Sequence, residues 1–230
     1  LSALNDIVIA STSTIDAQAT GENQRGGTIY IGTVQGSLDL QAGSVLDVSG
    51  TGNQRGGRIV LRAPRNAAND DLAITQVASD FRGAYRVDAE GFQAYNNVTD
   101  TANNITSAAI TQARSDNTAF MANEAAIRTR LSRDLDSNFH IVPGVELQST
   151  GDMNLSSSLD LASWRDGGEP GVLTLRAANS LNINNNLTDG FTGNSPMTTD
   201  SWSYRLVGGA DMTSANLLAT KLSYGAYGYG

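Results

Sequence analysis

A repeated octapeptide constrains the fold of this chain more than any other feature. Residues 24–31 read QRGGTIYI, and the motif returns as QRGGRIVL at 54–61. Upstream, STIDA at 13–17 returns as SVLDV at 44–48, a spacing longer by one position. The strand portion RIVLRA, at 58–63, has a fainter echo in VLTLRA at 172–177. Periods of this length are typical of stacked repeat architectures.

Within the repeats, apolar residues alternate with polar ones, as in SLDLQA at 37–42 and VLTL at 172–175. This is the period of a short strand with one buried face. Clusters of Gly, Asn and Asp separate the strands and supply the backbone conformations that tight corners need. The pattern predicts a mainly β fold, a parallel β-helix or solenoid whose coils bury their inward residues on one another.

A β-sandwich is the structural alternative, because it also contains short alternating strands separated by turns. A sandwich does not predict nearly identical octapeptides at 24–31 and 54–61. In a coil stack, equivalent positions lie about 4.8 Å apart and share one environment, which makes repetition expected. We therefore favour the stacked coils.

The middle of the chain, residues 96–136, lacks this alternation and has helical spacing instead. Phe120, Ile127 and Leu131 can share one face of a helix capped by Asp116 or Asn117. A weaker pattern predicts an earlier helix over about 100–114. We expect an α-helical insertion packed on the outside of the coils.

The chain is accordingly divided by composition and period. We predict β-helix coils at 1–66, a strand-rich extension at 67–95, the α-helical insertion at 96–136, further coils at 137–223 and a Tyr/Gly-rich end at 224–230.

Composition excludes several classes of function. The formal charge is −8, and the cations are too dilute for the basic stripe that binds nucleic acid. The chain has no Cys, which excludes disulfides, thiolate metal sites and a thiol nucleophile. Its apolar runs are far shorter than the roughly 20 residues of a membrane-spanning helix. We expect no cofactor and no bound metal.

The second coil region carries a family resemblance. Its segments are VPGVE at 142–146, WR at 164–165, GEPGVLTLRAA at 168–178, LTDGF at 187–191 and SWSYRLVGGAD at 201–211. Together with the QRGG coils, these segments resemble the carboxyl-side region of the filamentous haemagglutinin-like large exoproteins of bacteria.

The resemblance implies a right-handed β-helical passenger, secreted or displayed on the bacterial cell surface by an outer-membrane two-partner secretion transporter. It implies a structural and adhesive role toward a receptor or glycan on a host or neighbouring cell. A shaft that carries a contact-dependent toxin is a further possibility within the family. From the residues themselves, open coil ends predict end-to-end self-association.

A β-helical polysaccharide lyase or hydrolase is the competing enzyme hypothesis, because such enzymes use clustered carboxylates near an Arg. The candidates are Asp70 with Asp71, and Asp166 with Glu169 beside Arg165. Each acidic residue lies in a loop where carboxylates commonly form turns, so we assign no catalytic residue and predict a non-enzymatic protein.

Two further features of the sequence have structural explanations. The only histidine, His140, is expected to be a satisfied structural residue just before a strand. Arg25 and Arg55 are expected to form an outward ladder paired with carboxylates such as Glu22 or Asp47.

Overall fold

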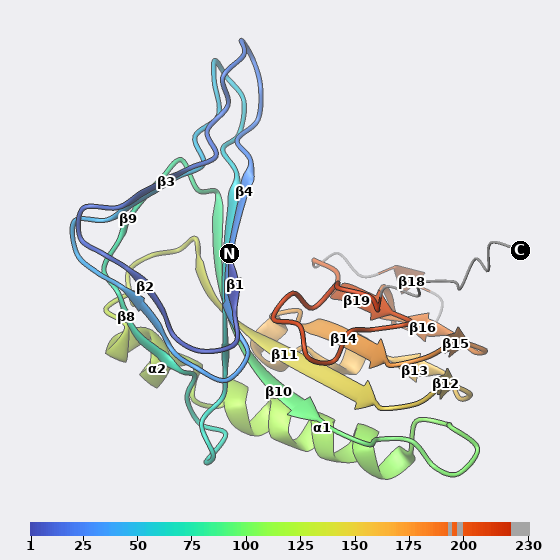
Figure 1. Cartoon of the computed structure of the whole chain (residues 1–230). Coiled ribbons are helices and arrows are strands. Elements are labelled where there is room, and N and C mark those ends of the chain that lie inside the picture. The colour runs from blue at the N-terminus through green and yellow to red at the C-terminus, as the bar shows by residue number, and fades with distance from the viewer. Residues whose placement is uncertain (193–194, 197–199, 222–230) are drawn as a thin grey trace, which may run out of the picture.

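The computed structural model describes residues 1–192, 195–196 and 200–221. In this part of the chain, one seven-stranded sheet curls into a half-barrel, with strand order β1-β4-β7-β10-β11-β14-β19 (Figure 1). Each neighbouring pair within it is parallel. Its strands are β1 (Ser2–Ala3), β4 (Thr28–Thr33), β7 (Arg58–Pro64), β10 (Arg86–Tyr95), β11 (Phe139–Ser149), β14 (Val172–Ala177) and β19 (Ser203–Val207).

Smaller sheets flank the large one, and most of them are also parallel. The first half of the chain forms the sheets β2-β5-β8 and β3-β6-β9, and the second half forms β12-β15 and β13-β16. A short antiparallel pair joins β17 (Phe191–Thr192) to β18 (Ser195–Pro196). The remaining strands are β2 (Ile7–Ile9), β3 (Thr14–Asp16), β5 (Leu38–Leu40), β6 (Val45–Asp47), β8 (Ile74–Val77), β9 (Asp80–Arg82), β12 (Met153–Leu155), β13 (Leu159–Asp160), β15 (Leu181–Ile183) and β16 (Leu187–Thr188).

The register of these strands reproduces the sequence repeat. Ile29 of the first QRGG copy pairs with Ile59 of the second, and Ile15 pairs with Leu46 in the same way. The prediction of a mainly β chain with stacked parallel strands is therefore confirmed, and the β-sandwich alternative is wrong. A closed right-handed β-helix is a finer claim than the curled sheet establishes, and it stays a prediction.

The glycines of the QRGG motif allow successive coils to approach closely. A Cβ at Gly57 would lie 1.7 Å from the carbonyl oxygen of Gly27, and one at Gly56 would lie 1.6 Å from that of Gly83. Both distances are far below van der Waals contact, so neither position tolerates a side chain without backbone movement. The QRGG motif therefore repeats glycines at one corner of the stack because successive coils approach closely there.

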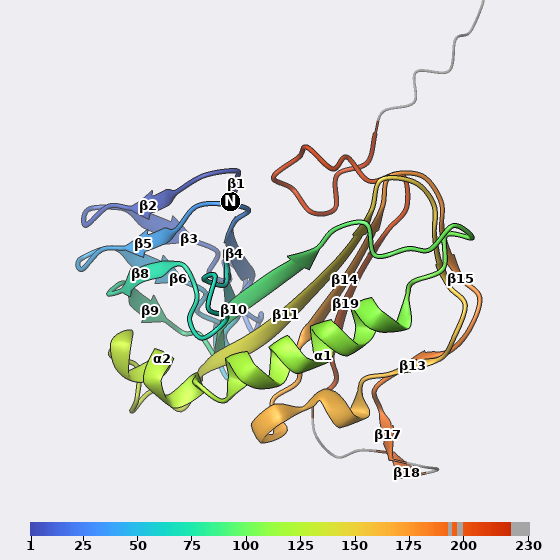
Figure 2. The same ribbon diagram turned by 90° about the horizontal axis from the view of Figure 1, so that it is seen from below.

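Strands β10 and β11 join two halves that lie on different sides of the molecule (Figure 2). The first half pairs with residues 86–92 of β10, whereas the second half pairs with residues 144–149 of β11. Each half has its own hydrophobic cluster, one around Leu40 and Leu61, the other around Leu147 and Leu175. The two long strands thus form the connection between two coil stacks.

The middle of the chain is helical, as predicted, but its boundaries differ. Helix α1 spans Ser107–Met121 and α2 spans Glu124–Arg130, with 3-10 turns later at Ala162–Trp164 and Asp166–Gly168. The expected helix start at Asp116 or Asn117 is wrong, because both residues lie inside α1 and its cap is Thr106. One helix therefore spans the point at which two were expected to separate. Phe120, Ile127 and Leu131 are buried in the first hydrophobic cluster, as expected. They do not share one helix, because Phe120 lies in α1, Ile127 in α2 and Leu131 just after α2.

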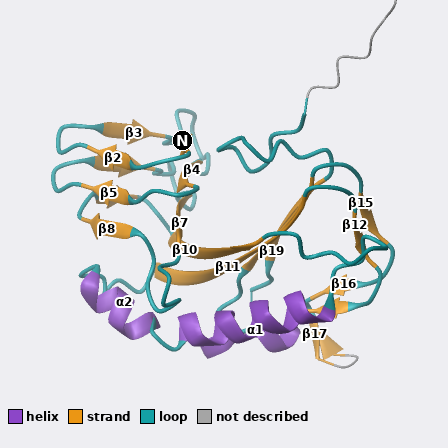
Figure 3. Ribbon diagram, turned by 60° about the horizontal axis from the view of Figure 1, so that its bottom comes forward, coloured by secondary structure: helices purple, strands orange, loops and turns teal. Residues whose placement is uncertain are grey.

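This helical insertion covers the inner end of each coil stack. In the first half, α2 lies beyond β8 (Figure 3). Arg130 donates to the carbonyl oxygen of Ile74 at 2.8 Å and Arg133 to that of Val77 at 2.6 Å. In the second half, the segment before α1 pairs with Asn154 of β12 through backbone hydrogen bonds of 2.7 and 3.0 Å. The insertion therefore satisfies strand edges that would otherwise be open. The predicted Tyr/Gly-rich end at 224–230 lies outside the described residues.

Candidate functional site on the polar face of the curled sheet

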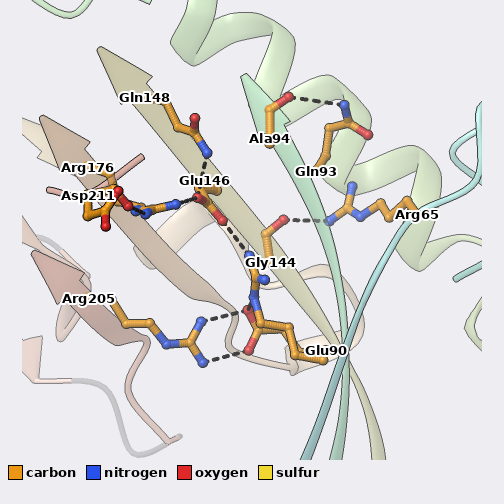
Figure 4. A network of polar contacts seen from close by, with 11 residues as sticks. Arg65, Glu90, Gln93, Ala94, Gly144, Glu146, Gln148, Arg176, Arg205 and Asp211 are labelled. Atoms are coloured by element: carbon orange, nitrogen blue, oxygen red, sulfur yellow. Dashed lines mark hydrogen bonds and ion pairs between the residues drawn. The ribbon is translucent and has the colours of Figure 1, made fainter. Parts of the chain in front are cut away.

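A network of charged side chains occupies one face of the seven-stranded sheet (Figure 4). Arg62 donates to Glu90 at 3.2 Å and also binds Glu146. Arg176 reaches the same Glu146 at 3.1 Å. Arg205 binds both carboxylate oxygens of Glu90 at 2.7 Å each, which is the bidentate geometry that a guanidinium favours. The network joins five strands of the sheet.

Strand alternation explains why these residues share a face. Successive side chains of a strand point to opposite sides, so Arg62 lies opposite the apolar Leu61 and Arg176 opposite Leu175. Arg62 and Arg176 occupy the same position in the two copies RIVLRA and VLTLRA, and both bind Glu146. The faint sequence echo between 58–63 and 172–177 therefore contains a signal of the network.

The charged residues of this network are almost fully buried, so each charge needs an opposite partner close by. Arg62, Glu90, Glu146 and Arg176 are each at most 2% exposed. Burial alone would raise the pKa of Glu90, but the adjacent Arg205 and Arg62 outweigh it and hold that pKa below its ordinary value. The guanidinium of Arg62 also lies 3.4 Å from the ring centroid of Phe92. Each charge has an opposite partner, which is typical of a structural network rather than a reactive centre.

A second charged cluster lies nearer the amino ends of the same strands. Asp88 accepts from both Arg58 and Arg86, and Arg86 also binds Glu169. His140 lies 3.0 Å from the other oxygen of Glu169, within β11 rather than before the strand. Burial would raise the pKa of Glu169, but the hydrogen bond from His140 and the charge of Arg86 lower it. The histidine has the partner expected of a structural residue.

The four candidate catalytic carboxylates each have a local partner. Asp70 accepts from Asn66 at 2.7 Å, and Asp71 pairs with Arg130 at 2.6 Å. Asp166 accepts from Thr118 of α1 at 3.1 Å, while Glu169 belongs to the His140 cluster. Arg165, expected beside Asp166 and Glu169, pairs with Asp189 at 3.0 Å. Asp71 and Glu169 thus bind different arginines, Arg130 and Arg86, while Asp166 contacts α1 and Arg165 contacts Asp189.

The described residues contain neither a candidate cluster of metal ligands nor a helix that could span a membrane. Across residues 1–192, 195–196 and 200–221, no group of three or more His, Asp or Glu side chains could hold a metal ion. In the same ranges, no helix combines the length and apolarity that crossing a bilayer requires.

The arginine ladder differs from its prediction. Arg25 and Arg55 are exposed one coil apart, yet within the described residues neither makes an ion pair with a carboxylate. Asp47 is engaged instead by the backbone N–H of Ser49 at 2.9 Å. The guanidinium of Arg55 stacks 3.6 Å from the ring centroid of Tyr85. The expected pairing with Glu22 or Asp47 is therefore wrong.

Two adjoining cavities meet at this corner. One, of about 330 Å³, lies between Arg25, Arg55 and the QRGG glycines. The other, of about 310 Å³, extends from Arg55 and Arg58 toward Arg86 and Ser203. Both lie at the amino ends of strands in the large sheet. Comparison with protein-family models, with curated proteins and with solved structures found no match to this chain.

Proposed function

We propose that this chain is a structural and adhesive segment of a secreted bacterial surface exoprotein, a right-handed parallel β-helical shaft that mediates attachment or filament formation. One observation carries the proposal. The helical insertion covers the inner ends of the two coil stacks, whereas apolar columns reach the surface uncovered at their outer ends.

The outer end of the second stack is the clearer case. Leu173 pairs with Tyr204 and Leu175 with Leu206, so the buried apolar columns continue onto β19. Among the described residues the columns end there, with Tyr204 36% and Leu206 45% exposed. In the same part of the chain β19 is an edge of the large sheet, so it offers unpaired backbone groups beside apolar side chains.

The outer end of the first stack has the same character. Strand β1 is the other edge of the large sheet, and β2 and β3 are the edges of the two small ones. Exposed apolar side chains lie along this coil at Leu1, Leu4 and Val8, the last of them 55% exposed. Exposed apolar side chains beside open strand edges are a surface that favours association.

A further coil of the same kind is the partner that fits such an end, since it extends the parallel ladder and covers the apolar columns together. In a solution of this chain alone, a second copy provides that coil. Repetition of the contact builds a stiff rod, which supports a role in attachment. The secretion transporter and a surface receptor or glycan complete the proposal through the family resemblance described above.

Sedimentation equilibrium over a wide range of concentrations tests this proposal. We expect the wild-type chain to associate, and Leu206→Lys to weaken association because it places a charge on the apolar end. Leu135→Lys is the matched control, since Leu135 is 96% exposed and lies in the helical insertion. A wild-type chain that is strictly monomeric at high concentration, or an equal effect of both substitutions, would overturn the proposal.

A further inference from the structure

The arginines at the QRGG corner differ in how their charge is compensated. Arg58 and Arg86 are neighbours in register on β7 and β10, and both bind Asp88. Arg25 and Arg55 are likewise one coil apart, but within the described residues they have no carboxylate partner. Like charges one coil apart repel each other, so the second pair favours an external anion.

One of these two arginines is held in place before any ligand arrives. Arg55 is stacked on Tyr85, which restrains its side chain. The backbone next to Arg25 is closely packed, because a Cβ at the adjacent Gly26 would lie 1.7 Å from the carbonyl oxygen of Val48. A site with positions set in advance loses less conformational entropy on binding.

The corner also has room for a ligand. The cavity of about 330 Å³ is lined by Gly26, Gly27, Gly56 and Gly57, which contribute no side chains to fill it. Arg58 also lines the cavity, with its guanidinium bound to Asp88. This concentration of cationic groups occurs on a chain with a formal charge of −8.

The chemistry of the lining indicates which kind of group would bind. Because the guanidinium of Arg55 covers one face of the Tyr85 ring, a ligand on that side meets the guanidinium and not the ring. A guanidinium presents a planar fork of N–H donors, which matches the two oxygens of a carboxylate or a phosphate.

We propose that Arg25 and Arg55 form a binding site for an oxyanion, a carboxylate or phosphate group. The inference is independent of the shaft function, because it rests on the corner of the first stack and not on the coil ends. A chain that does not self-associate can still bind the anion, and the reverse also holds.

Isothermal titration calorimetry of the full chain at low ionic strength tests the site, with inorganic phosphate in one arm and citrate in the other. Binding of either supports the proposal, and the tighter ligand identifies the oxyanion class. We expect Arg25→Gln and Arg55→Gln each to weaken binding about tenfold, the loss of one charge-assisted contact.

Arg114→Gln is the matched control, because Arg114 is an exposed arginine on α1 away from this corner. It removes the same charge and should leave the affinity unchanged. Thermal unfolding of each variant checks that it is folded. The absence of heat with both anions, or the same loss of affinity in Arg114→Gln as in Arg55→Gln, would overturn the proposal.

Discussion

Two neighbouring columns of residues in the large sheet are both buried, but one is apolar and the other is charged. Ile31, Leu61, Ala89 and Ile141 pair in register across four strands, and all are 0% exposed. One residue further along, on the opposite face, Arg62 pairs with Glu90. The stability of the apolar column depends on how completely its side chains fill the core. The stability of the polar column depends on pairing each charge with an opposite one.

The contrast indicates what the polar column contributes. Buried ion pairs lose about as much through desolvation as they gain through attraction, so they are weak evidence of net stability. A slip of one residue, however, would move Arg62 from the polar face to the apolar one. We infer that the charged network specifies the register of strands whose apolar patterns alone are similar.

The largest effect is expected from removing a charge inside the polar column. Glu90→Gln keeps the side-chain volume but removes the carboxylate that Arg205 binds and leaves Arg62 with Glu146 alone. We expect the free energy of unfolding to fall by about 3–5 kcal/mol, the typical cost of breaking a buried ion pair. Urea denaturation monitored by circular dichroism measures it. A fall below about 1 kcal/mol would show that the network is not needed.

The apolar column should respond through volume instead. Leu61→Ala removes three carbon atoms from a fully buried side chain, and we expect a loss of about 2–5 kcal/mol with no change in pH dependence. The same denaturation experiment at two pH values measures both quantities. A pH-dependent loss would mean that the two faces are coupled.

Lowering the pH should affect the stability of the polar face of the sheet and not that of the apolar face. Both Glu90 and Glu169 have lowered pKa values, because neighbouring cations outweigh burial. Their contribution is therefore fully present above the ordinary glutamate pKa and is lost as the pH falls through the lowered values. We expect the wild-type urea midpoint to decrease with acidification, and less steeply in Glu90→Gln. Parallel pH profiles for the two chains would contradict this assignment.

The smallest effect is expected for an ion pair outside both columns. Arg82 and Asp80 are 2.8 Å apart with side chains 55% and 58% exposed. Arg82→Gln should change the free energy of unfolding by less than about 1 kcal/mol, as surface pairs do. A cost comparable to that of Glu90→Gln would mean that burial does not decide the importance of a charge in this protein.

The apolar column could be predicted from the sequence, and the polar one could not. Alternation and the QRGG repeat identify Ile29 and Ile59 as equivalent inward positions, which the register confirms. The same alternation makes Arg62 resemble any solvent-facing strand residue. Its burial follows from the curl of the sheet and from Glu146, a partner on a strand far along the chain. Single-sequence periodicity contains no information about such contacts.

The helical insertion shows a similar division. Its buried residues Phe120, Ile127 and Leu131 follow from their spacing. Its role in covering strand edges depends on Arg130 and Arg133, which reach carbonyl groups of β8 far earlier in the chain. Long polar side chains give no periodic signal of this kind, so only the structure identifies their partners.

Hydrogen exchange at low and high protein concentration tests the central claim most directly, because it reports on the coil ends themselves. We predict that the outward-facing backbone amides of β1 and β19, those not bonded to β4 and β14, exchange quickly in dilute solution. They become protected at high concentration, when a second copy covers them. Amides of β11, inside the sheet, should be protected at both concentrations. Equal exchange of β1 and β19 at the two concentrations would contradict the account of a coil stack with open outer ends.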